Sequence, residues 1–361
     1  MILLIDASNI LAGGGKTHLV ELLKHAEPAS HGFDKVIVYG HVVVMKEIPP
    51  KSWLVKVTPA LFGYGYFGRL LWKIVARRSV KNSIWFVPGT GSAPGNYVTM
   101  CQNLLPLESR EIERYFFSIT WIRLLLLRFL QRKAYRNAIG VIFLNQYSWS
   151  RLPLSLQRRI EHKAFIPHGI SKIFRPFEKL SDFDGGVFRF VYVSTIDEYK
   201  HQWVAAKAIR ELRDAGHNVS IDFVGNAYAP SLKRLIPFLG EGINYKGEIR
   251  YQALPELYSS YDCFILCSTC ETFGMVLLEA MACGLPILCS NRSSMPETLK
   301  DNAMYFNPES IDETREKILF MLMNKGVLLE LSRKGLNYVT SFTWKNTSER
   351  TFDFINQCAK Q

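Results

Sequence analysis

The stretch DCFILCSTCETFGMVLLEAMACGLPILCS (262–290) reads as a strand, a helix and a second strand in direct succession. DCFILCS (262–268) and LPILCS (285–290) are short and almost continuously apolar, which is typical of parallel strands covered on both faces. FGMVLLEAMACG (273–284), between them, is rich in Ala, Leu and Met, and the Gly-Leu-Pro sequence at its end is a helix stop. This pattern predicts a parallel sheet with helices packed on both sides.

The same alternation continues along almost the whole chain. Strand candidates in the first half are 1–6, 35–40, 83–88, 96–101 and 140–145. Those in the second half are 188–194, 219–225, 243–248, 262–268 and 285–290. Two such sets predict an α/β protein with two Rossmann-like, doubly wound domains. The stretch IPHGISKIFRPF (166–177) loses the periodicity and is the predicted seam between them.

The excess of positive charge lies entirely in the first half of the chain. The 361 residues have a net charge of +12, and residues 1–170 hold 22 basic and 9 acidic side chains, against 22 and 23 in residues 171–361. A one-sided basic surface favours an anionic partner, such as a phospholipid headgroup or a nucleic acid, but a solvated basic face has the same composition. Since no nucleic-acid-binding motif accompanies the charge, we expect no nucleic-acid partner.

The sequence indicates a cytoplasmic protein. MILLID (1–6) starts a strand pattern without a charged leader. The longest apolar segment, 115–130, is interrupted by Arg123 and Arg128 and is shorter than the about 20 residues of a spanning helix. Seven cysteines, mostly inside apolar runs, are typical of small core residues in a reducing compartment.

The spacing of Cys263, Cys267 and Cys270 is also that of an iron–sulfur ligand set. Cys263 and Cys267 fall on one face of a predicted strand, which places them about 13 Å apart. Ligands of one compact cluster cannot be so distant, so buried thiols are the favoured interpretation. No other metal-ligand pattern is visible, and we expect no metal cofactor.

Glu271 and Glu279 are the candidate ligand-binding residues of the opening stretch. Glu271 follows the predicted strand, at the carboxyl edge where doubly wound sheets bind ligands. The amides of Phe273 and Gly274, at the helix start, are available to an anionic or hydroxyl oxygen. Glu279 lies about two turns into the helix among apolar residues, where a carboxylate is costly without a partner. A helix that happens to carry two glutamates remains the alternative.

ETFGMVLLEAMACGLPIL (271–288) and MPETLKDNAMYFNP (295–308) resemble the donor-site signature of family 4 glycosyltransferases. The resemblance covers most of residues 170–345 and is weaker in the first half. It implies a retaining enzyme of the type B fold, with two Rossmann-like domains facing each other across a cleft and no metal requirement. It also implies that Glu271, helped by the amides of Phe273 and Gly274, contacts the transferred sugar, while Glu279 holds the ribose hydroxyls of a nucleotide sugar.

Three further segments extend this resemblance. In FVYVSTIDEYKHQ (190–202) the family has a Gly-Arg pair and then a Lys; here Ser194 and Thr195 replace the pair and Lys200 is present. Both family cations neutralise the donor diphosphate, so Lys200 or a nearby residue such as His201 has to compensate for Thr195. VGNAYAP (224–230) with Gly225, and KGEIRYQ (246–252) near Ile249, resemble the family's nucleotide-binding turn and base-recognition segment.

The first half offers fewer candidates. LAGGGKTHLVELL (11–23) places glycines between a strand and a helix, and the family's loop at this point faces the donor diphosphate, which makes Gly14 and Gly15 candidates. A phosphate-binding P-loop is excluded, because Ile10 stands where its first Gly is required. Asn103, after the predicted strand 96–101, is a candidate contact to the acceptor; capping of its own loop is the equal alternative.

Two basic segments, 61–81, which contains no acid, and 109–137, carry many aromatic and aliphatic residues. In 109–137, helical spacing puts Arg110, Arg114, Arg128, Arg132 and Arg136 on one side. Such amphipathic helices bind anionic membranes, although helices that cover the first sheet with their arginines in solvent fit equally well.

Together these patterns predict domains over 1–168 and 169–343, with a final helix over 344–361 that crosses back to the first domain. The favoured function is transfer of a hexose from a UDP- or GDP-linked sugar to a lipid-linked or oligosaccharide acceptor, in the biosynthesis of a surface polysaccharide such as O-antigen. The protein is expected to be cytoplasmic and peripheral to the inner membrane. A sugar-nucleotide epimerase on the same fold, or a scaffold inactivated by Thr195, are the alternatives.

Overall fold

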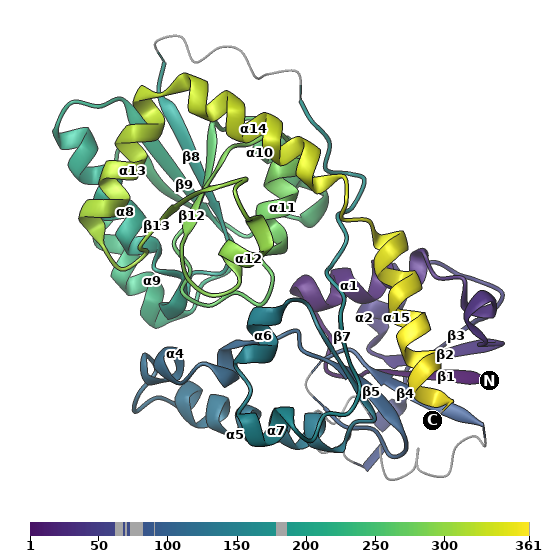
Figure 1. Cartoon of the computed structure of the whole chain (residues 1–361). Helices are drawn as coiled ribbons and strands as arrows, with labels where there is room; N and C mark the ends of the chain where they lie inside the picture. The colour runs from purple at the N-terminus through teal and green to yellow at the C-terminus, as the bar shows by residue number, and fades with distance from the viewer. Residues whose placement is uncertain (62–67, 69–70, 73–81, 90, 178–185, 361) are drawn as a thin grey trace. The chain divides into compact units, whose positions relative to one another are not determined.

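The computed structural model describes residues 1–61, 68, 71–72, 82–89, 91–177 and 186–360. The chain divides into two compact units, each described here by itself (Figure 1). Unit 1 comprises Met1–Ile112, Phe116–Gly169 and Phe342–Gln361, and unit 2 comprises Glu113–Tyr115 and Ile170–Ser341. Each unit is built on its own sheet.

Unit 1 contains, among its described residues, a parallel sheet of seven strands in the order β3-β2-β1-β4-β5-β6-β7. The strands are β1 (Ile2–Ala7), β2 (Lys35–Gly40), β3 (Leu54–Val57), β4 (Ser83–Val87), β5 (Tyr97–Met100), β6 (Gly140–Phe143) and β7 (Lys163–Phe165). The strand order reverses between β1 and β4, which is the topological switch point of a doubly wound sheet.

Unit 2 contains a parallel sheet of six strands in the order β10-β9-β8-β11-β12-β13. The strands are β8 (Phe188–Val193), β9 (Val219–Val224), β10 (Ile243–Gly247), β11 (Cys263–Leu266), β12 (Ile287–Ser290) and β13 (Met304–Phe306). Here the order reverses between β8 and β11. The predicted α/β class with two parallel sheets is therefore confirmed.

The central strands were predictable because they are buried on both faces. Every residue of β11 and β12 is buried, as is every residue of β5 and β6, and such strands read as continuous apolar runs. Strands β3, β7 and β13 were not predicted. These three are edge strands of three or four residues and are mostly half-buried, so no apolar run marks them.

Helices cover the faces of both sheets. In the first half they are α1 (Gly13–Lys24), α2 (Val42–Glu47), α4 (Ser109–Glu113), α5 (Ile119–Asn137), α6 (Gln146–Ser150) and α7 (Leu154–Gln157). Those of unit 2 are α8 (Gln202–Asp214), α9 (Ala229–Leu235), α10 (Leu254–Tyr258), α11 (Met275–Ala282), α12 (Met295–Leu299), α13 (Ile311–Met323) and α14 (Lys325–Val339). In the part of the chain that the structure describes, no helix combines the length and the apolar character needed to cross a membrane.

The final helix, α15 (Trp344–Ala359), belongs to unit 1, where it packs against α1 and the sheet. Thr343 caps it by accepting a hydrogen bond from the Asn346 amide (3.2 Å). Gly169 is a requirement of this packing, because a Cβ added there would lie 2.2 Å from the backbone nitrogen of Trp344.

The prediction of one helical segment over 109–137 is wrong. The segment forms α4 and α5, which are separated at Phe117, whose φ of +59° is incompatible with a right-handed helix. Ser118 then caps α5 by accepting a hydrogen bond from the Trp121 amide (3.2 Å). Arg110 consequently does not share a helical face with the arginines of α5. The cations predicted in 61–81, namely Arg69, Lys73, Arg77, Arg78 and Lys81, lie outside the described residues.

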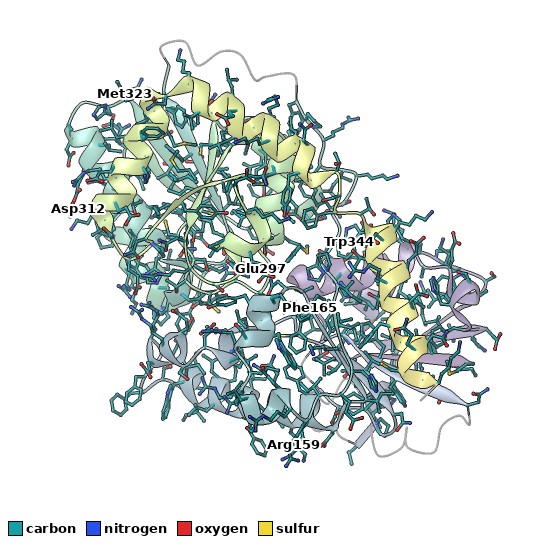
Figure 2. All side chains as sticks on the ribbon, in the orientation of Figure 1. Arg159, Phe165, Glu297, Asp312, Met323 and Trp344 are labelled. Carbon is teal, nitrogen blue, oxygen red and sulfur yellow. The ribbon has the colours of Figure 1, made fainter. Side chains whose placement is uncertain are left out.

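Two histidines and a tryptophan form a buried cluster in unit 1. His18 of α1 and His168 are both buried, with their Nδ1 atoms 3.0 Å apart, and both rings pack against Trp344, which Figure 2 labels at the start of α15. One imidazole donates to the other, which requires at least one neutral ring. Burial lowers the pKa of His18 to about 3, and burial together with His18 lowers the pKa of His168.

We predict that this pair makes unit 1 sensitive to acid. The unfolded chain protonates both rings near pH 6.5, whereas the folded chain keeps them neutral, so stability is lost as pH falls from 6.5 towards 3. Each ring contributes a slope of up to about 1.4 kcal/mol per pH unit. Urea unfolding at pH 7 and pH 5 should show this loss in the wild type and about half of it in His18→Gln. An unchanged slope in His18→Gln, or a changed one in the half-exposed control His217→Gln, would contradict the assignment.

Candidate functional site

Lys200 and Glu271 meet where the strand order of unit 2 reverses. Lys200 ends the turn after β8, Glu271 follows β11, and these two strands are neighbours in the sheet. The Lys200 Nζ donates to a carboxylate oxygen of Glu271, and both side chains are largely buried. Two residues 71 positions apart, both predicted from the sequence, are thus brought into one ion pair at the carboxyl edge of the sheet.

The backbone of Glu271 is held by two serines that the sequence analysis missed. The Ser293 hydroxyl accepts from the Glu271 amide (3.0 Å) and lies 2.9 Å from its carbonyl oxygen, to which Ser294 also donates (2.8 Å). Ser293 adopts a φ of +56°, which a non-glycine residue rarely does. These bonds tie the loop after β12 to the loop after β11 and orient Glu271. The two serines and Glu271 are joined only by tertiary contacts, so no local sequence pattern could have revealed the role of the serines.

Glu279 is the fifth residue of α11, just over one turn into the helix rather than two. It is buried, and its carboxylate accepts a hydrogen bond from the Tyr251 hydroxyl (2.8 Å). Burial raises the pKa of Glu279 to about 7, against a smaller opposing effect of the Tyr251 hydrogen bond. Tyr251 is the partner that the sequence argument required for a buried carboxylate but did not identify.

We predict that Glu279 costs the unliganded protein stability at alkaline pH. Because its folded pKa of about 7 exceeds the ordinary value of 4.5, the native state binds the extra proton, and stability falls as pH rises from 4.5 through 7. Above pH 7 the cost approaches about 3 kcal/mol. Glu279→Gln, which stays neutral, should therefore unfold at higher urea than the wild type at pH 8 and at similar urea at pH 5. Equal differences at both pH values would contradict this, and the exposed Glu248→Gln serves as the control.

The start of α11 presents backbone amides beside Glu271. Gly274 caps the helix with a left-handed conformation (φ +77°), and a Cβ there would lie 2.9 Å from the Leu277 side chain. Phe273 before it is buried. A helix start leaves its first amides without intrahelical partners, and Phe273 and Gly274 lie at this start.

Gly225 sits where β8 and β9 end side by side. Its φ is +138°, and a Cβ would lie 2.3 Å from the Ser194 carbonyl oxygen, so only glycine fits. Thr195 is exposed, and its carbonyl accepts from the Gln202 side chain (2.9 Å). Ile249 is half-buried in the loop after β10.

His201 is the residue next to Lys200 and has an unusual conformation. Its φ is +49°, it is 4% exposed, and its Nε2 lies 3.4 Å from the Thr269 hydroxyl. It therefore occupies the same edge of the sheet as Lys200, and its ring is within reach of the loop that carries Glu271.

The candidates from the first half of the chain belong to unit 1. Gly14 and Gly15 are in the first turn of α1 after β1; a Cβ at Gly14 would touch nothing, whereas one at Gly15 would lie 3.2 Å from the Gln102 side-chain oxygen. Asn103 is exposed, and its side chain accepts from the Leu105 amide (3.2 Å). Asn103 thus makes the loop-capping bond that the sequence analysis held as the alternative to acceptor binding.

The cysteines of the opening stretch are buried thiols. Cys263 is the first residue of β11 and Cys267 lies just beyond its end; both are buried, and burial raises the pKa of both thiols. In the described ranges, no group of three or more His, Cys, Asp or Glu side chains is arranged to hold a metal ion.

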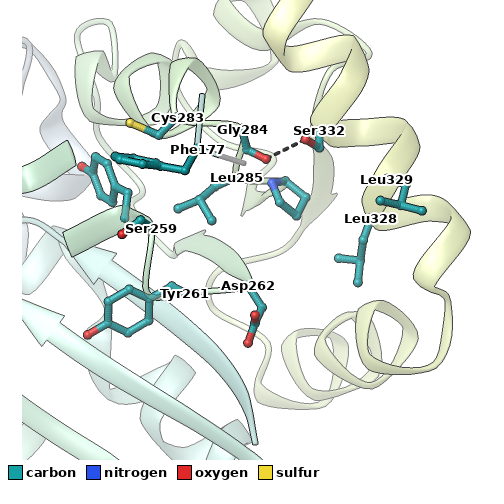
Figure 3. A pocket seen from close by; sticks show the side chains of 12 residues that line it. Phe177, Ser259, Tyr261, Asp262, Cys283, Gly284, Leu285, Leu328, Leu329 and Ser332 are labelled. Carbon is teal, nitrogen blue, oxygen red and sulfur yellow. Dashed lines mark hydrogen bonds between the residues drawn. The ribbon is translucent and has the colours of Figure 1, made fainter. Parts of the chain in front are cut away.

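Two cavities lie elsewhere in unit 2. One of about 30 Å³ is at the amino-terminal edge of the sheet, where Asp262 and Pro286 precede β11 and β12 and Ser332 donates to the Gly284 carbonyl (Figure 3). It has room for about one water molecule and not for a nucleotide sugar. A second, open cavity of about 570 Å³ adjoins His201. Its cations Lys207 and Arg234 are already paired, with Glu211 and Glu198, so we assign it no ligand.

The part of the chain that matches a known protein family lies within unit 2. Residues 176–337 match the family model "Glycosyl transferases group 1". The O-antigen chain mannosyltransferase B of Escherichia coli is 33% identical over 111 residues, which are 31% of this chain and 29% of that protein. The GDP-mannose-dependent alpha-(1-6)-phosphatidylinositol monomannoside mannosyltransferase of Mycobacterium tuberculosis is 24% identical over 178 residues, 46% of each. The matched part thus spans less than half the length of these curated relatives.

The whole chain resembles solved structures in fold. The sucrose-phosphate synthase of Thermosynechococcus elongatus superposes with a TM-score of 0.74 at 16% identity, over 97% of both chains. At this identity the likeness shows the fold alone, and it confirms the expected type B fold, with two parallel-sheet α/β domains. The family match and the curated relatives together support a glycosyltransferase.

Proposed function

We propose that this protein is a retaining glycosyltransferase that moves a hexose from a UDP- or GDP-linked sugar to a lipid-linked or oligosaccharide acceptor in surface-polysaccharide biosynthesis. The observation that carries the proposal is the buried Lys200–Glu271 pair at the switch point of a domain matching group 1 glycosyl transferases. Mannosyltransferases among the relatives, one of them named as GDP-mannose-dependent, make GDP-mannose the first donor to test.

Lys200 and Glu271 act on the sugar diphosphate. In the unliganded protein each neutralises the other. When the donor binds, the carboxylate of Glu271 accepts hydrogen bonds from hydroxyls of the hexose, and the ammonium of Lys200 turns to the diphosphate, whose charge grows as the leaving group departs. A preorganised cation at that point is worth several kcal/mol of transition-state stabilisation. The backbone amides at the start of α11, at Phe273 and Gly274, add hydrogen-bond donors without added charge.

Glu279 binds the ribose of the nucleotide. Ribose hydroxyls that donate to its carboxylate favour the ionised form and lower its raised pKa, so donor binding below pH 7 releases a proton. The Tyr251 hydroxyl donates to this carboxylate in the unliganded protein. When the ribose binds, this hydrogen bond is either kept beside those of the ribose or replaced by them. Gly225 lets the backbone approach the nucleotide closely, and the backbone near Ile249 contacts the base.

Thr195 stands where the family has a second phosphate cation, and His201 is the group that we assign to compensate for it. Its buried position beside Lys200 and its strained backbone support this role. In unit 1, Gly14 and Gly15 offer backbone amides to the diphosphate, and Asn103 is a polar contact to the acceptor. Asn103 cannot act as a base, so a phosphate oxygen of the donor takes the acceptor proton on the face from which the leaving group departs.

The proposal places the protein in the cytoplasm, peripheral to the inner membrane, where a lipid-linked acceptor is presented. The basic segments 61–81 and 109–137 support contact with anionic lipid. No nucleic-acid partner is proposed.

The test begins with thermal shifts of the full chain in UDP-, GDP- and dTDP-sugars, followed by transfer to a lipid-linked saccharide extract. We expect one nucleotide sugar to raise the melting temperature, and transfer to keep the anomeric configuration. Since Lys200 supplies the positive charge at the diphosphate, EDTA should leave the rate unchanged. Release of an epimerised sugar without an acceptor would establish the epimerase instead, and no shift with any donor in a folded sample would overturn the proposal.

A further inference from the structure

The outward face of α5 is apolar. Four residues spaced by three, four and three positions, Ile119, Ile122, Leu126 and Phe129, are 87%, 62%, 55% and 63% exposed. This spacing puts them on one side of the helix. A helix that only covers a sheet turns its apolar side inward and its charges outward, so α5 is apolar where water would be expected.

The loop before α5 extends this surface. Phe117 is 93% exposed and adopts the φ of +59° that interrupts the helix, while Phe116 packs edge-to-face against it with ring centroids 4.5 Å apart. A bulky residue rarely adopts that conformation, and here it holds an aromatic ring in solvent. We call Phe116, Phe117 and the four α5 residues the α5 stripe.

The sequence analysis placed arginines on the presented side of this segment, and the structure differs. Arg128 turns inward, where its guanidinium donates to the Pro106 carbonyl (2.6 Å) and to the Ser109 hydroxyl (3.2 Å). Leu124 and Tyr135 anchor the opposite side of α5 in the core of unit 1. The helix therefore covers the sheet and also presents a second apolar face.

Positive charge surrounds the stripe. Residues 116–160 contain eight Lys and Arg and no Asp or Glu. Arg123, Lys133 and Arg136 on α5 are exposed, and α7, which contacts α5, adds the exposed Leu154 and, just after it, Arg159 (Figure 2). An apolar strip with a cationic rim complements a bilayer that has anionic headgroups.

A second copy of the chain is a poorer occupant, because it would bring eight positive charges against eight. The arginines within α5, together with the absence of a spanning helix in the described ranges, are consistent with a helix that lies in the plane of the interface.

We propose that the α5 stripe inserts into the headgroup region of an anionic lipid bilayer, with Arg123, Lys133 and Arg136 contacting lipid phosphates. Membrane binding then depends on apolar insertion and not only on the basic charge that the sequence indicates. The inference deepens the proposed function, on which it rests for its purpose, namely access to a lipid-linked acceptor.

The test is co-sedimentation of the full chain with vesicles of phosphatidylcholine alone or mixed with phosphatidylglycerol. We expect binding to the anionic vesicles that raised salt weakens but does not abolish. The variant Phe117→Ser/Ile119→Ser/Ile122→Ser should lower the partition coefficient by about tenfold or more. A matched control, Ile236→Ser/Met323→Ser, removes exposed apolar side chains from unit 2 and should bind like the wild type.

Unchanged binding in the triple variant, or binding that high salt removes completely, would overturn the insertion. The lipid assignment would be overturned if the wild-type protein bound no vesicle and instead self-associated or bound another protein. The variant residues are exposed, so melting curves and donor thermal shifts should match the wild type. If the protein bound vesicles but responded to no nucleotide sugar, membrane insertion of the α5 stripe would be supported and the proposed transferase function would be rejected.

Discussion

Glu271→Ala is expected to lower kcat/KM for sugar transfer by at least about a hundredfold. The change removes the carboxylate that is proposed to hold the hexose, and it leaves Lys200, 8% exposed, without its partner. Breaking a buried pair from one side costs about 3–5 kcal/mol, because the remaining charge stays desolvated. Activity and stability should therefore both fall.

The double variant Glu271→Ala/Lys200→Met separates these two losses. Removing the orphaned cation should restore much of the free energy of unfolding, whereas transfer should stay at or fall below the level of Glu271→Ala, because Lys200 is itself proposed to stabilise the leaving group. The exposed Glu256→Ala on α10 is the matched control and should leave both quantities unchanged. Transfer by a folded Glu271→Ala protein at a rate close to the wild type would remove Glu271 from the site and, with it, the main support of the proposed function.

Gly225→Ala is expected to destabilise unit 2 by about 3 kcal/mol or more, with loss of donor binding. A methyl group there would lie 2.3 Å from the Ser194 carbonyl oxygen, and the φ of +138° is open essentially to glycine alone. Backbone atoms on both sides cannot move without separating β8 from β9. Thr195 and Lys200 lie in the loop after β8, so the proposed donor site should be lost with this pairing.

Two other glycines provide a graded comparison. Gly247 has a φ of +72°, and a Cβ added there would meet open space. Gly247→Ala should therefore lower the free energy of unfolding only by the strain of a left-handed alanine, about 1 kcal/mol. Gly326→Ala, in α14, has open space and no positive φ, and should be neutral or slightly stabilising. Melting curves should rank Gly326→Ala, Gly247→Ala and Gly225→Ala in order of increasing loss. Equal losses for the last two would show that the Ser194 contact is not the cause.

The sequence by itself determined five of the six strands in the sheet of unit 2 and the edge on which its candidate site lies. Buried parallel strands such as β11 and β12 are almost entirely apolar, and this local property is visible in one chain. Polar residues in the loops after such strands gather at one sheet edge, which is why Glu271 was expected there. Lys200 was expected from the resemblance to family 4 glycosyltransferases, and the structure joins the two residues in one ion pair.

Only the tertiary structure decided which distant groups meet. The serine pair behind Glu271 and the Tyr251 hydroxyl on Glu279 come from other loops, and nothing near the glutamates in the sequence specifies them. The short edge strands β3, β7 and β13 also depend on tertiary contacts. Each is held in extended form by backbone pairing with one neighbouring strand, and its own composition does not mark it as a strand.

The α5 segment shows the distinction most clearly. Helical spacing determines that a chain such as 119–137 has distinct faces, because the period of 3.6 residues is a local property of the backbone. Which face packs inward depends on the surface that receives it. Here Arg128 donates a hydrogen bond to the Pro106 carbonyl, and the apolar side of α5 that carries Tyr135 packs in the core of unit 1. The α5 stripe therefore remains exposed. The sequence contained the charge and the periodicity, and the packing of unit 1 decided which side of the helix meets the solvent or the lipid.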